Sequence, residues 1–267
     1  MSYHIIHIGS PNVSLTCKHG QLVCRHDDVE HTLPMEDIAS VVVTSFSAVI
    51  HSEVLLQAAE KGVAFIYCRN FKPSSIVLPA NRSTDTHLTR AAVTLSNKVR
   101  SALWRKTVTA KCLNQYALAE HIEPQHKILA AFHRCARSDL KNKESVCAKY
   151  FWRVFGEAVG EKSFTRIREG GGINNLLNFG YTVLLSVFLR TALAVGLDPT
   201  FGIHHKIRER ATPLAYDLME PFRPCIDELV LNWIMNCSAQ SHEVTHEFKQ
   251  RLTTLAARKL PYLQQQL

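Results

Sequence analysis

The hydrophobic pattern of this 267-residue chain changes character at about residue 80. Up to that point the chain consists of short runs rich in β-forming residues, separated by turn sequences such as Ser10-Pro11-Asn12. Beyond a linker at residues 79–84, helical periodicity continues almost to the C-terminus. The change predicts an α+β multidomain protein, with a small N-terminal β-rich domain over residues 1–80 and a larger all-α domain over residues 81–267.

The periodicity also predicts the individual elements. Strands are expected at residues 3–8, 13–17, 21–24, 38–44, 63–68 and 75–78, with one helix at 51–61 that Gly62 ends. Helices are expected at 85–120, 124–137, 142–159, 173–196, 213–238 and 242–259. The longest apolar stretch, residues 176–197, contains Asn178 and Arg190, so we expect a buried core helix and no membrane span.

The distribution of charge and the spacing of the cysteines limit the kinds of partner and of structural site that this chain can have. Residues 1–80 carry 5 basic and 7 acidic side chains, whereas residues 81–267 carry 26 and 16, so the helical part holds a net charge of +10. Such a surplus favours a polyanionic partner. The eight cysteines form no C-x-x-C pair, which argues against a disulfide scaffold or a thiolate zinc site and favours reduced thiols. Because the N-terminus also lacks signal-peptide features, we expect a cytoplasmic protein.

A short H-E-x-x-H pattern occurs at His242-Glu243-Val244-Thr245-His246. On a helix, two histidines at this spacing share one face and can bind zinc. No acidic or histidine side chain follows Glu247 to supply a third ligand. We therefore favour a chance match over a zinc peptidase.

Three other segments carry candidate metal ligands. Thr212-Pro213 is a helix-start signal, and the following Asp217 and Glu220 are spaced to share a face, with Pro221 predicting a kink. His205 follows a Gly- and Pro-containing turn and precedes Lys206, Arg208 and Arg210. Glu144 stands in the first turn of a helix rich in aromatic residues. Taken singly, each could be structural: an acidic face, a surface histidine, or a favourable first-turn charge.

Taken together, the segments resemble the CRISPR-associated integrase/endonuclease of spacer acquisition, the Cas-one protein family. The resemblance rests on four blocks in order: E-x-x-x-A with aromatics, N-x-L-L-N-x-G-Y, G-L-D-P-x-x-G-x-x-H and D-L-M-E-x-F-R-P. They span Glu144 to Phe151-Trp152, the segment ending at Tyr181, Gly196 to His205, and Asp217 to Pro224. The glycine spacing selects His205 over His204.

The resemblance implies catalytic metal ligands at Glu144, His205 and Glu220, with Asp217 as a neighbouring acidic residue. Two carboxylates and an imidazole suit Mg²⁺ or Mn²⁺. The implied reaction is insertion of captured DNA into a CRISPR array, in which a DNA 3′-OH performs the transesterification and no protein nucleophile is needed. In this view, the all-α domain is catalytic. Basic residues near the ligands are expected to bind DNA phosphates: Lys206, Arg208, Arg210 and Arg223.

The implied partners are double-stranded DNA, both captured fragment and CRISPR repeat, and a second copy of the chain, with dimerisation expected through the β-rich domain. The resemblance further implies a small ferredoxin-like acquisition partner that joins two dimers into a heterohexamer in the prokaryotic cytoplasm. The alternative is a non-catalytic basic DNA-binding or scaffolding protein whose carboxylates are structural.

Overall fold

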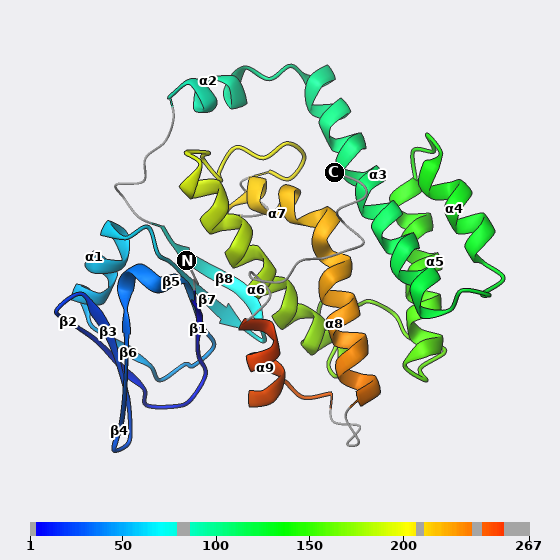
Figure 1. Ribbon diagram of the computed structural model, residues 1–267. Helices are drawn as coiled ribbons and strands as arrows, with labels where there is room; N and C mark the ends of the chain where they lie inside the picture. The colour runs from blue at the N-terminus through cyan, green and yellow to red at the C-terminus, as the bar shows by residue number, and fades with distance from the viewer. Residues whose placement is uncertain (1–3, 79–85, 207–210, 237–241, 254–267) are drawn as a thin grey trace.

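The computed structural model describes residues 4–78, 86–206, 211–236 and 242–253. A strand-rich region comes first and a helical region follows, as the sequence predicts (Figure 1). The first contains β1 (His4–Ile8), β2 (Ser14–Lys18), β3 (Gln21–His26), β4 (Val29–Pro34), η1 (Met35–Asp37), β5 (Ile38–Val43), β6 (Val49–Ile50), α1 (Ser52–Glu60), β7 (Ala64–Arg69) and β8 (Lys72–Val77). The second contains α2 (Thr86–Thr94), α3 (Asn97–Ile122), α4 (Leu129–Arg137), α5 (Lys143–Ala158), α6 (Ile173–Ala194), α7 (Pro213–Met219), η2 (Glu220–Phe222), α8 (Arg223–Asn236) and α9 (His246–Thr253).

The strands form two four-stranded sheets, ordered β1-β5-β7-β8 and β4-β3-β2-β6. In the first sheet β1, β5 and β7 are parallel and β8 is antiparallel. Every residue of β5 is buried, which explains why its sequence is apolar apart from Ser40. Val41 and Val43 belong to a core shared with the second sheet and α1, whereas Ala39 and Val42 belong to the core of the helical region. The β1-β5-β7-β8 sheet therefore contributes side chains to both hydrophobic cores, one on each of its faces.

Helix α6 lies at the centre of the second core. It packs against β5, β7 and β8 on the sheet side, and against α7, α8 and α9. The guanidinium of Arg190 donates to the backbone oxygen of Ile38 at 2.9 Å and so ties α6 to β5. By length and composition α6 could cross a membrane, but 78% of its apolar window is buried inside the protein. The prediction of a core helix is confirmed.

Several predicted elements differ in detail from the observed ones. The single helix expected at 85–120 is two helices, because Ser96 caps α3 by accepting from the Val99 backbone amide at 3.3 Å. The helix expected at 213–238 is interrupted by η2 at Pro221, where the kink was predicted. Strands β4 and β6 were not predicted, because β4 is a polar edge strand and β6 has two residues. The linker at 79–84 and the end of the last predicted helix lie outside the described residues.

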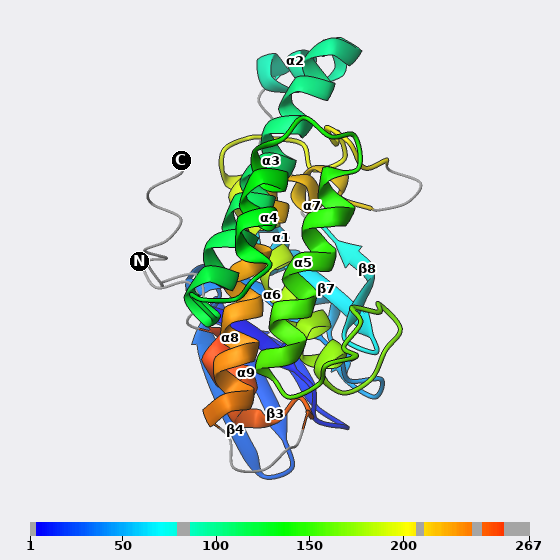
Figure 2. The ribbon, with the colours of Figure 1, turned by 90° about the vertical axis from the view of Figure 1, so that its right-hand side faces the viewer.

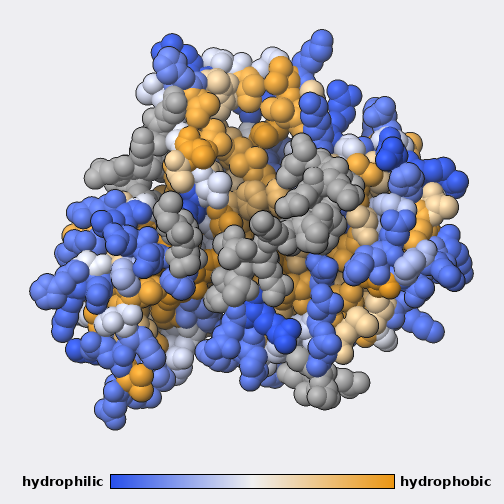
Figure 3. Space-filling model, viewed as in Figure 1, coloured by the Kyte–Doolittle hydropathy of each residue, from blue (hydrophilic) through white to orange (hydrophobic). Residues whose placement is uncertain are grey.

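Helix α2 stands away from the rest of the molecule at the end of α3 (Figures 1 and 2). None of its residues is buried. Apolar side chains of α2 and the start of α3 are exposed there, and they form the upper hydrophobic area in Figure 3. They are Leu88, Val93, Val99 and Leu103.

Cysteines lie mainly inside the protein as free thiols. Cys112, Cys135 and Cys147 are buried where α3, α4 and α5 meet, and the Sγ atoms of Cys147 and Cys135 are 3.6 Å apart. The seven cysteines of the described residues are unbridged, in agreement with the prediction of reduced thiols. Cys237 lies outside those residues.

Candidate metal and nucleic-acid site

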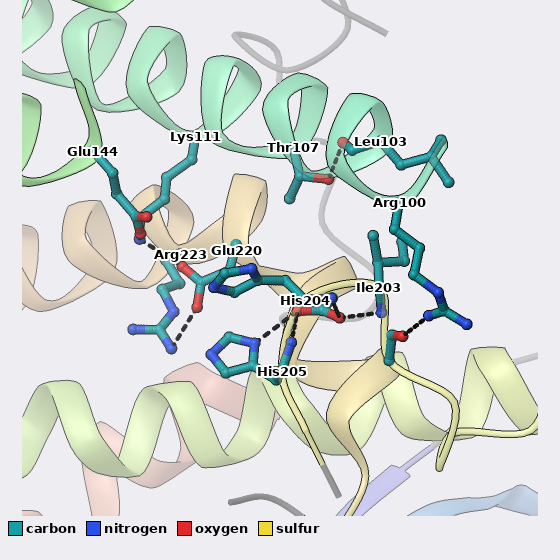
Figure 4. Close-up of polar contacts among 12 residues, drawn as sticks. Arg100, Leu103, Thr107, Lys111, Glu144, Ile203, His204, His205, Glu220 and Arg223 are labelled. Carbon is teal, nitrogen blue, oxygen red and sulfur yellow. Dashed lines mark hydrogen bonds and ion pairs between the residues drawn. The ribbon is translucent and has the colours of Figure 1, made fainter. Parts of the chain in front are cut away.

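Two of the expected ligands, Glu144 and Glu220, converge on one lysine ammonium. Glu144 lies in the first turn of α5, and Glu220 opens the short helix η2. Lys111, on α3, places its Nζ 2.6 Å from Glu144 Oε1 and 2.7 Å from Glu220 Oε2 (Figure 4). Three chain segments that are far apart in the sequence therefore bring two carboxylates to a single cation.

Glu220 is held inside the protein by its neighbours. Its side chain is 5% exposed, and Arg223 pairs with its Oε1 at 2.8 Å. Asn114 on α3 donates to the Pro221 backbone oxygen at 2.7 Å, which fixes η2 against α3. Burial raises the pKa of Glu220, but the charges of Arg223 and Lys111 outweigh burial and leave the pKa below its ordinary value. The carboxylate is therefore ionised at neutral pH.

His205 is oriented by Asp217. The Asp217 carboxylate accepts from His205 Nδ1 at 2.6 Å and from the backbone amides of Ile203 and His204 at 2.6 and 2.9 Å. This contact fixes Nδ1 as the bonded nitrogen and leaves Nε2 as the nitrogen for a ligand. His205 lies near enough to Glu220 to contribute to the lowered pKa of that carboxyl. Asp217 is completely buried, so it acts as a support for His205 and not as an exposed ligand.

The loop that carries His205 requires glycine at position 202. A Cβ on Gly202 would lie 2.4 Å from the His205 backbone oxygen and 2.7 Å from Pro213 Cβ, so a larger residue would displace the loop. Arg100 at the start of α3 donates to the Gly202 backbone oxygen at 2.6 Å (Figure 4). Thr212 precedes α7 and Pro213 begins it, as predicted, although the Thr212 side chain makes no capping hydrogen bond.

A buried polar network lies behind Arg223. Its guanidinium stands over the Tyr181 ring, 4.8 Å from the centroid, and the Tyr181 hydroxyl donates to Asp227. Burial raises the pKa of Asp227 to about 7, against the lowering effects of the Tyr181 hydrogen bond and nearby arginines. Arg223, one of the predicted DNA-binding residues, is thus engaged by Glu220 and Tyr181 within the protein.

The buried asparagines of α6 have the partners that burial demands. Asn174 Oδ1 and Asn178 Oδ1 accept from Arg166 at 2.9 and 2.7 Å. A cavity of about 220 Å³ lies beside this network. Its basic lining residues are Lys72, Arg166, Arg168 and Arg223.

A second cavity, of about 570 Å³, lies between the start of α3 and the 201–206 loop. Its wall includes Trp104 and His204, whose rings stack at 4.1 Å with an angle of 4° between the planes. Arg105, His205 and Lys206 also line it. This combination of flat rings and cations suits a nucleic-acid strand. It also separates the roles of the adjacent histidines, since His204 stacks on Trp104 while His205 bonds Asp217.

Not all predicted residues meet at one point. In the part of the chain that the structure describes, no three His, Cys, Asp or Glu side chains stand ready to share one metal ion. Glu144 and Glu220 instead share the Lys111 ammonium. Lys206 lies at the edge of the second cavity, whereas Arg208 and Arg210 lie outside the described residues.

The donor set nevertheless fits a divalent cation. Two carboxylates already face one positive charge, and the buried Glu220 Oε2 is matched by no hydrogen bond beyond its ion pair with Lys111. His205 adds an imidazole whose other nitrogen is bonded to a carboxylate, the usual arrangement for a metal-binding histidine.

The H-E-x-x-H pattern is not a helical zinc site. Residues 242–245 precede α9, and only His246 lies on that helix. His242 Nδ1 instead lies 3.7 Å from Glu161, and His246 contacts Gln250. The two histidines therefore do not present the shared helix face on which a zinc peptidase depends.

Sequence reasoning missed the contribution of α3. Arg100, Thr107 and Lys111 recur at helical spacing and face the site (Figure 4), and Trp104 of the same helix lines the cavity beside His204. The spacing was visible in the sequence, but long basic helices commonly have solvated stripes of this kind. Only the tertiary partners distinguish Lys111 from a surface lysine.

The fold and site together define a protein with a strand-rich N-terminal region and a helical region that gathers carboxylates and a histidine beside basic and aromatic side chains. The family model described as "CRISPR associated protein Cas1" matches residues 6–261. The chain belongs to the Cas1 family. A relative from Neisseria meningitidis serogroup C (strain 8013), named a CRISPR-associated endonuclease Cas1, is 29% identical over 246 residues, covering 89% of this chain and 78% of the relative.

Solved structures support the same fold. A Cas1 protein from Thermotoga maritima matches with a TM-score of 0.80 at 16% identity, covering 96% of this chain and 89% of that one. A casposase bound to its integration product matches with a TM-score of 0.74 at 21% identity, covering 95% and 82%. A chain of a Cas6-RT-Cas1–Cas2 complex matches with a TM-score of 0.75 at 14% identity, covering 96% and 32%.

Proposed function

We propose that this protein is a metal-dependent DNA integrase and endonuclease that inserts captured DNA fragments into a CRISPR array by 3′-OH transesterification. The observation that carries the proposal is the convergence of Glu144 and Glu220 on one positive charge, beside a histidine whose Nδ1 is bonded to Asp217. Membership of the Cas1 family supports it, as do relatives named endonucleases and a structural neighbour that is a casposase with its product.

In this proposal Glu144, Glu220 and His205 would hold Mg²⁺ or Mn²⁺. The ion, when bound, supplies Lewis-acid stabilisation of charge on the phosphodiester. The protein's own residues do the positioning. Asp217 keeps the His205 ring oriented, Arg223 and Asn114 keep η2 and Glu220 in place, and Arg100 holds the loop against α3.

The cavity beside Trp104 and His204 gives the DNA strand a place next to His205. Bases can stack on exposed ring faces, and Arg105 and Lys206 can meet phosphates there. Because a similar chain is part of a Cas6-RT-Cas1–Cas2 complex, we further propose that this chain assembles as a homodimer that acts in the cytoplasm. A small Cas2-type partner would join two dimers.

The test uses two carboxylate variants, Glu144→Gln and Glu220→Gln. Each is expected to lower Mn²⁺-dependent joining of a 3′-OH oligonucleotide to a repeat duplex by more than about a hundredfold, since each loses an anionic ligand. Circular dichroism and DNA binding should stay near wild type. Glu157→Gln is the matched control, because Glu157 is also on α5 but pairs with His126 and Arg153.

One observation favours a second candidate. Lys111 is already paired with both carboxylates, as expected if the pair has a structural role in a non-catalytic DNA-binding protein. Under that alternative, the wild type binds DNA but joins no strands in Mn²⁺. If the wild type joins strands and both glutamine variants do so equally well, the reaction does not depend on these carboxylates. That result would contradict our assignment.

A further inference from the structure

The gap between Glu144 and Glu220 is filled by a side chain of the protein itself. Lys111 Nζ is within 2.7 Å of both carboxylates, and its side chain is 12% exposed. Its two carboxylate partners place a lysine ammonium between the two proposed ligands.

A divalent cation cannot bind both carboxylates while the ammonium stays there. Mg²⁺ binds oxygen at roughly 2.0–2.1 Å, shorter than the 2.6 and 2.7 Å that separate the ammonium from the two oxygens. The carboxylates thus already point at one spot and need to close by about half an ångström each to hold such an ion. That spot is the position of Lys111 Nζ.

The charges indicate which cation leaves. Lys111 and Arg223 together balance Glu144 and Glu220, so a metal entering this neutral group adds two positive charges unless one cation withdraws. Arg223 touches only Glu220 of the pair and is held over the Tyr181 ring. Lys111 contacts both carboxylates and has a flexible stem with a point charge at its end. Lys111 is therefore the cation that a metal replaces.

We propose that Lys111 is an exchangeable counter-cation: it holds Glu144 and Glu220 together in the metal-free protein and sets metal affinity because the ion must displace it. This inference rests on the proposed function, since it takes the two carboxylates as metal ligands. It assigns Lys111 a positioning role that the ligand motif does not include.

Lys143 provides a matched control. Lys143 is buried, comes from the helix that carries Glu144, and donates from Nζ to Thr109 Oγ1 at 2.7 Å. Lys111→Met and Lys143→Met therefore each remove one ammonium from the same part of the structure. Only the first removes the ammonium that bridges the carboxylates.

The experiment measures Mn²⁺ binding by titration calorimetry and the thermal midpoint with and without Mn²⁺, for the wild type and both variants. Without metal, Lys111→Met should unfold at a lower temperature than the wild type, because two carboxylates lose their shared cation. It should bind Mn²⁺ about tenfold more tightly and gain more thermal stability from it. Lys143→Met should bind Mn²⁺ like the wild type.

The outcomes separate the two proposals. Mn²⁺ binding that Lys111→Met leaves unchanged or weakens overturns the exchange while leaving the metal site intact. Absence of Mn²⁺ binding in the wild type and in both variants overturns the proposed metal site itself. Tightening by both lysine variants would reflect net charge alone and would also overturn the exchange.

A measurement on the wild type covers the case in which Lys111→Met does not fold. Acetylation by an amine-reactive ester, read by mass spectrometry, should leave Lys111 protected without metal and modify it several-fold faster in Mg²⁺. Lys143 should stay protected in both conditions. Equal protection of Lys111 with and without Mg²⁺, at Mg²⁺ concentrations that stabilise the protein, overturns the proposal.

Discussion

The strand-rich and helical regions bury very different side chains. Among described residues before position 79, Ser40 is the single fully buried polar side chain. The helical region buries a much larger set. It comprises Asn114, Gln115, Lys143, Asn174, Asn178, Thr182, Ser186, Thr212, Asp217, Glu220 and Asp227. Buried polar and charged groups cost free energy unless they are paired, so their concentration in one region indicates where the fold sacrifices stability to hold a site.

The two regions should therefore respond differently to mutation. In the strand-rich region, a substitution should change stability and leave the site alone. In the helical region, a substitution that preserves shape should change metal binding or the pH dependence of stability.

The largest effect is expected from Leu15→Ala in β2. Leu15 is completely buried in the core between the two sheets, so the truncation leaves a cavity and should lower the free energy of unfolding by about 2–5 kcal/mol. Denaturant titration measures the loss. Mn²⁺ affinity of the folded variant should equal that of the wild type; a tenfold change would mean that the β core and the site are coupled, and the contrast would fail.

Asp227→Asn tests the cost of a buried carboxyl. Because its pKa is raised to about 7, folded Asp227 keeps a proton that the unfolded chain has lost between pH 4 and 7. Stability of the wild type therefore falls as pH rises through that range and levels off above pH 7. The amide does not titrate, so the variant should gain on the wild type by about 2–3 kcal/mol between pH 5 and pH 8.

The measurement is denaturant unfolding of both proteins at pH 5 and pH 8. Any constant cost of the amide cancels in the difference between the two pH values. A variant-minus-wild-type difference that is the same at both values would show that the pKa of Asp227 is not raised.

A smaller effect is expected from Asp217→Asn. The amide cannot accept all of the backbone hydrogen bonds from Ile203 and His204, and it loses the charge that orients His205. Mn²⁺ binding should weaken by about 10- to 100-fold. Asp198→Asn is the control in the same loop, because Asp198 accepts from the backbone amide and the hydroxyl of Thr200. Equal weakening in both variants would assign the effect to the loop as a whole.

The smallest effect is expected from Arg25→Ala in β3. Arg25 pairs with Glu30 on the surface, where both side chains are exposed and solvent screens the charges. Thermal unfolding should shift by less than that of any variant above, with an expected loss below about 1 kcal/mol. A larger loss would show that the strand-rich region also relies on ion pairs.

Much of the fold could be predicted from the sequence. Runs of mostly apolar residues predict the buried strand β5 and the core helix α6. Pro221 predicts the break between α7 and α8. Strand β4 was missed because its polar residues lack alternation; its place in the sheet comes from hydrogen bonds to β3. The local hydrophobic pattern of a strand does not show which other strand it pairs with.

The site was predictable only in part. The resemblance to the Cas1 family implied Glu144, His205 and Glu220 as ligands, and the structure brings the two glutamates to one cation. The sequence could not show that Lys111 lies between them, because nothing local distinguishes it from other basic residues of α3. The same holds for the stack of His204 on Trp104, which depends on how the 201–206 loop meets α3. The placement of a ligand's neighbours is a tertiary property.

The sheet β1-β5-β7-β8 has a broader consequence. Its two faces supply side chains to both cores, and Arg190 connects α6 to the backbone of β5. A fragment beginning at residue 86 would lack this sheet and would expose the apolar face of α6 to solvent. The chain should therefore unfold in one cooperative transition. Each region expressed alone should aggregate through its exposed apolar surface and should not fold independently.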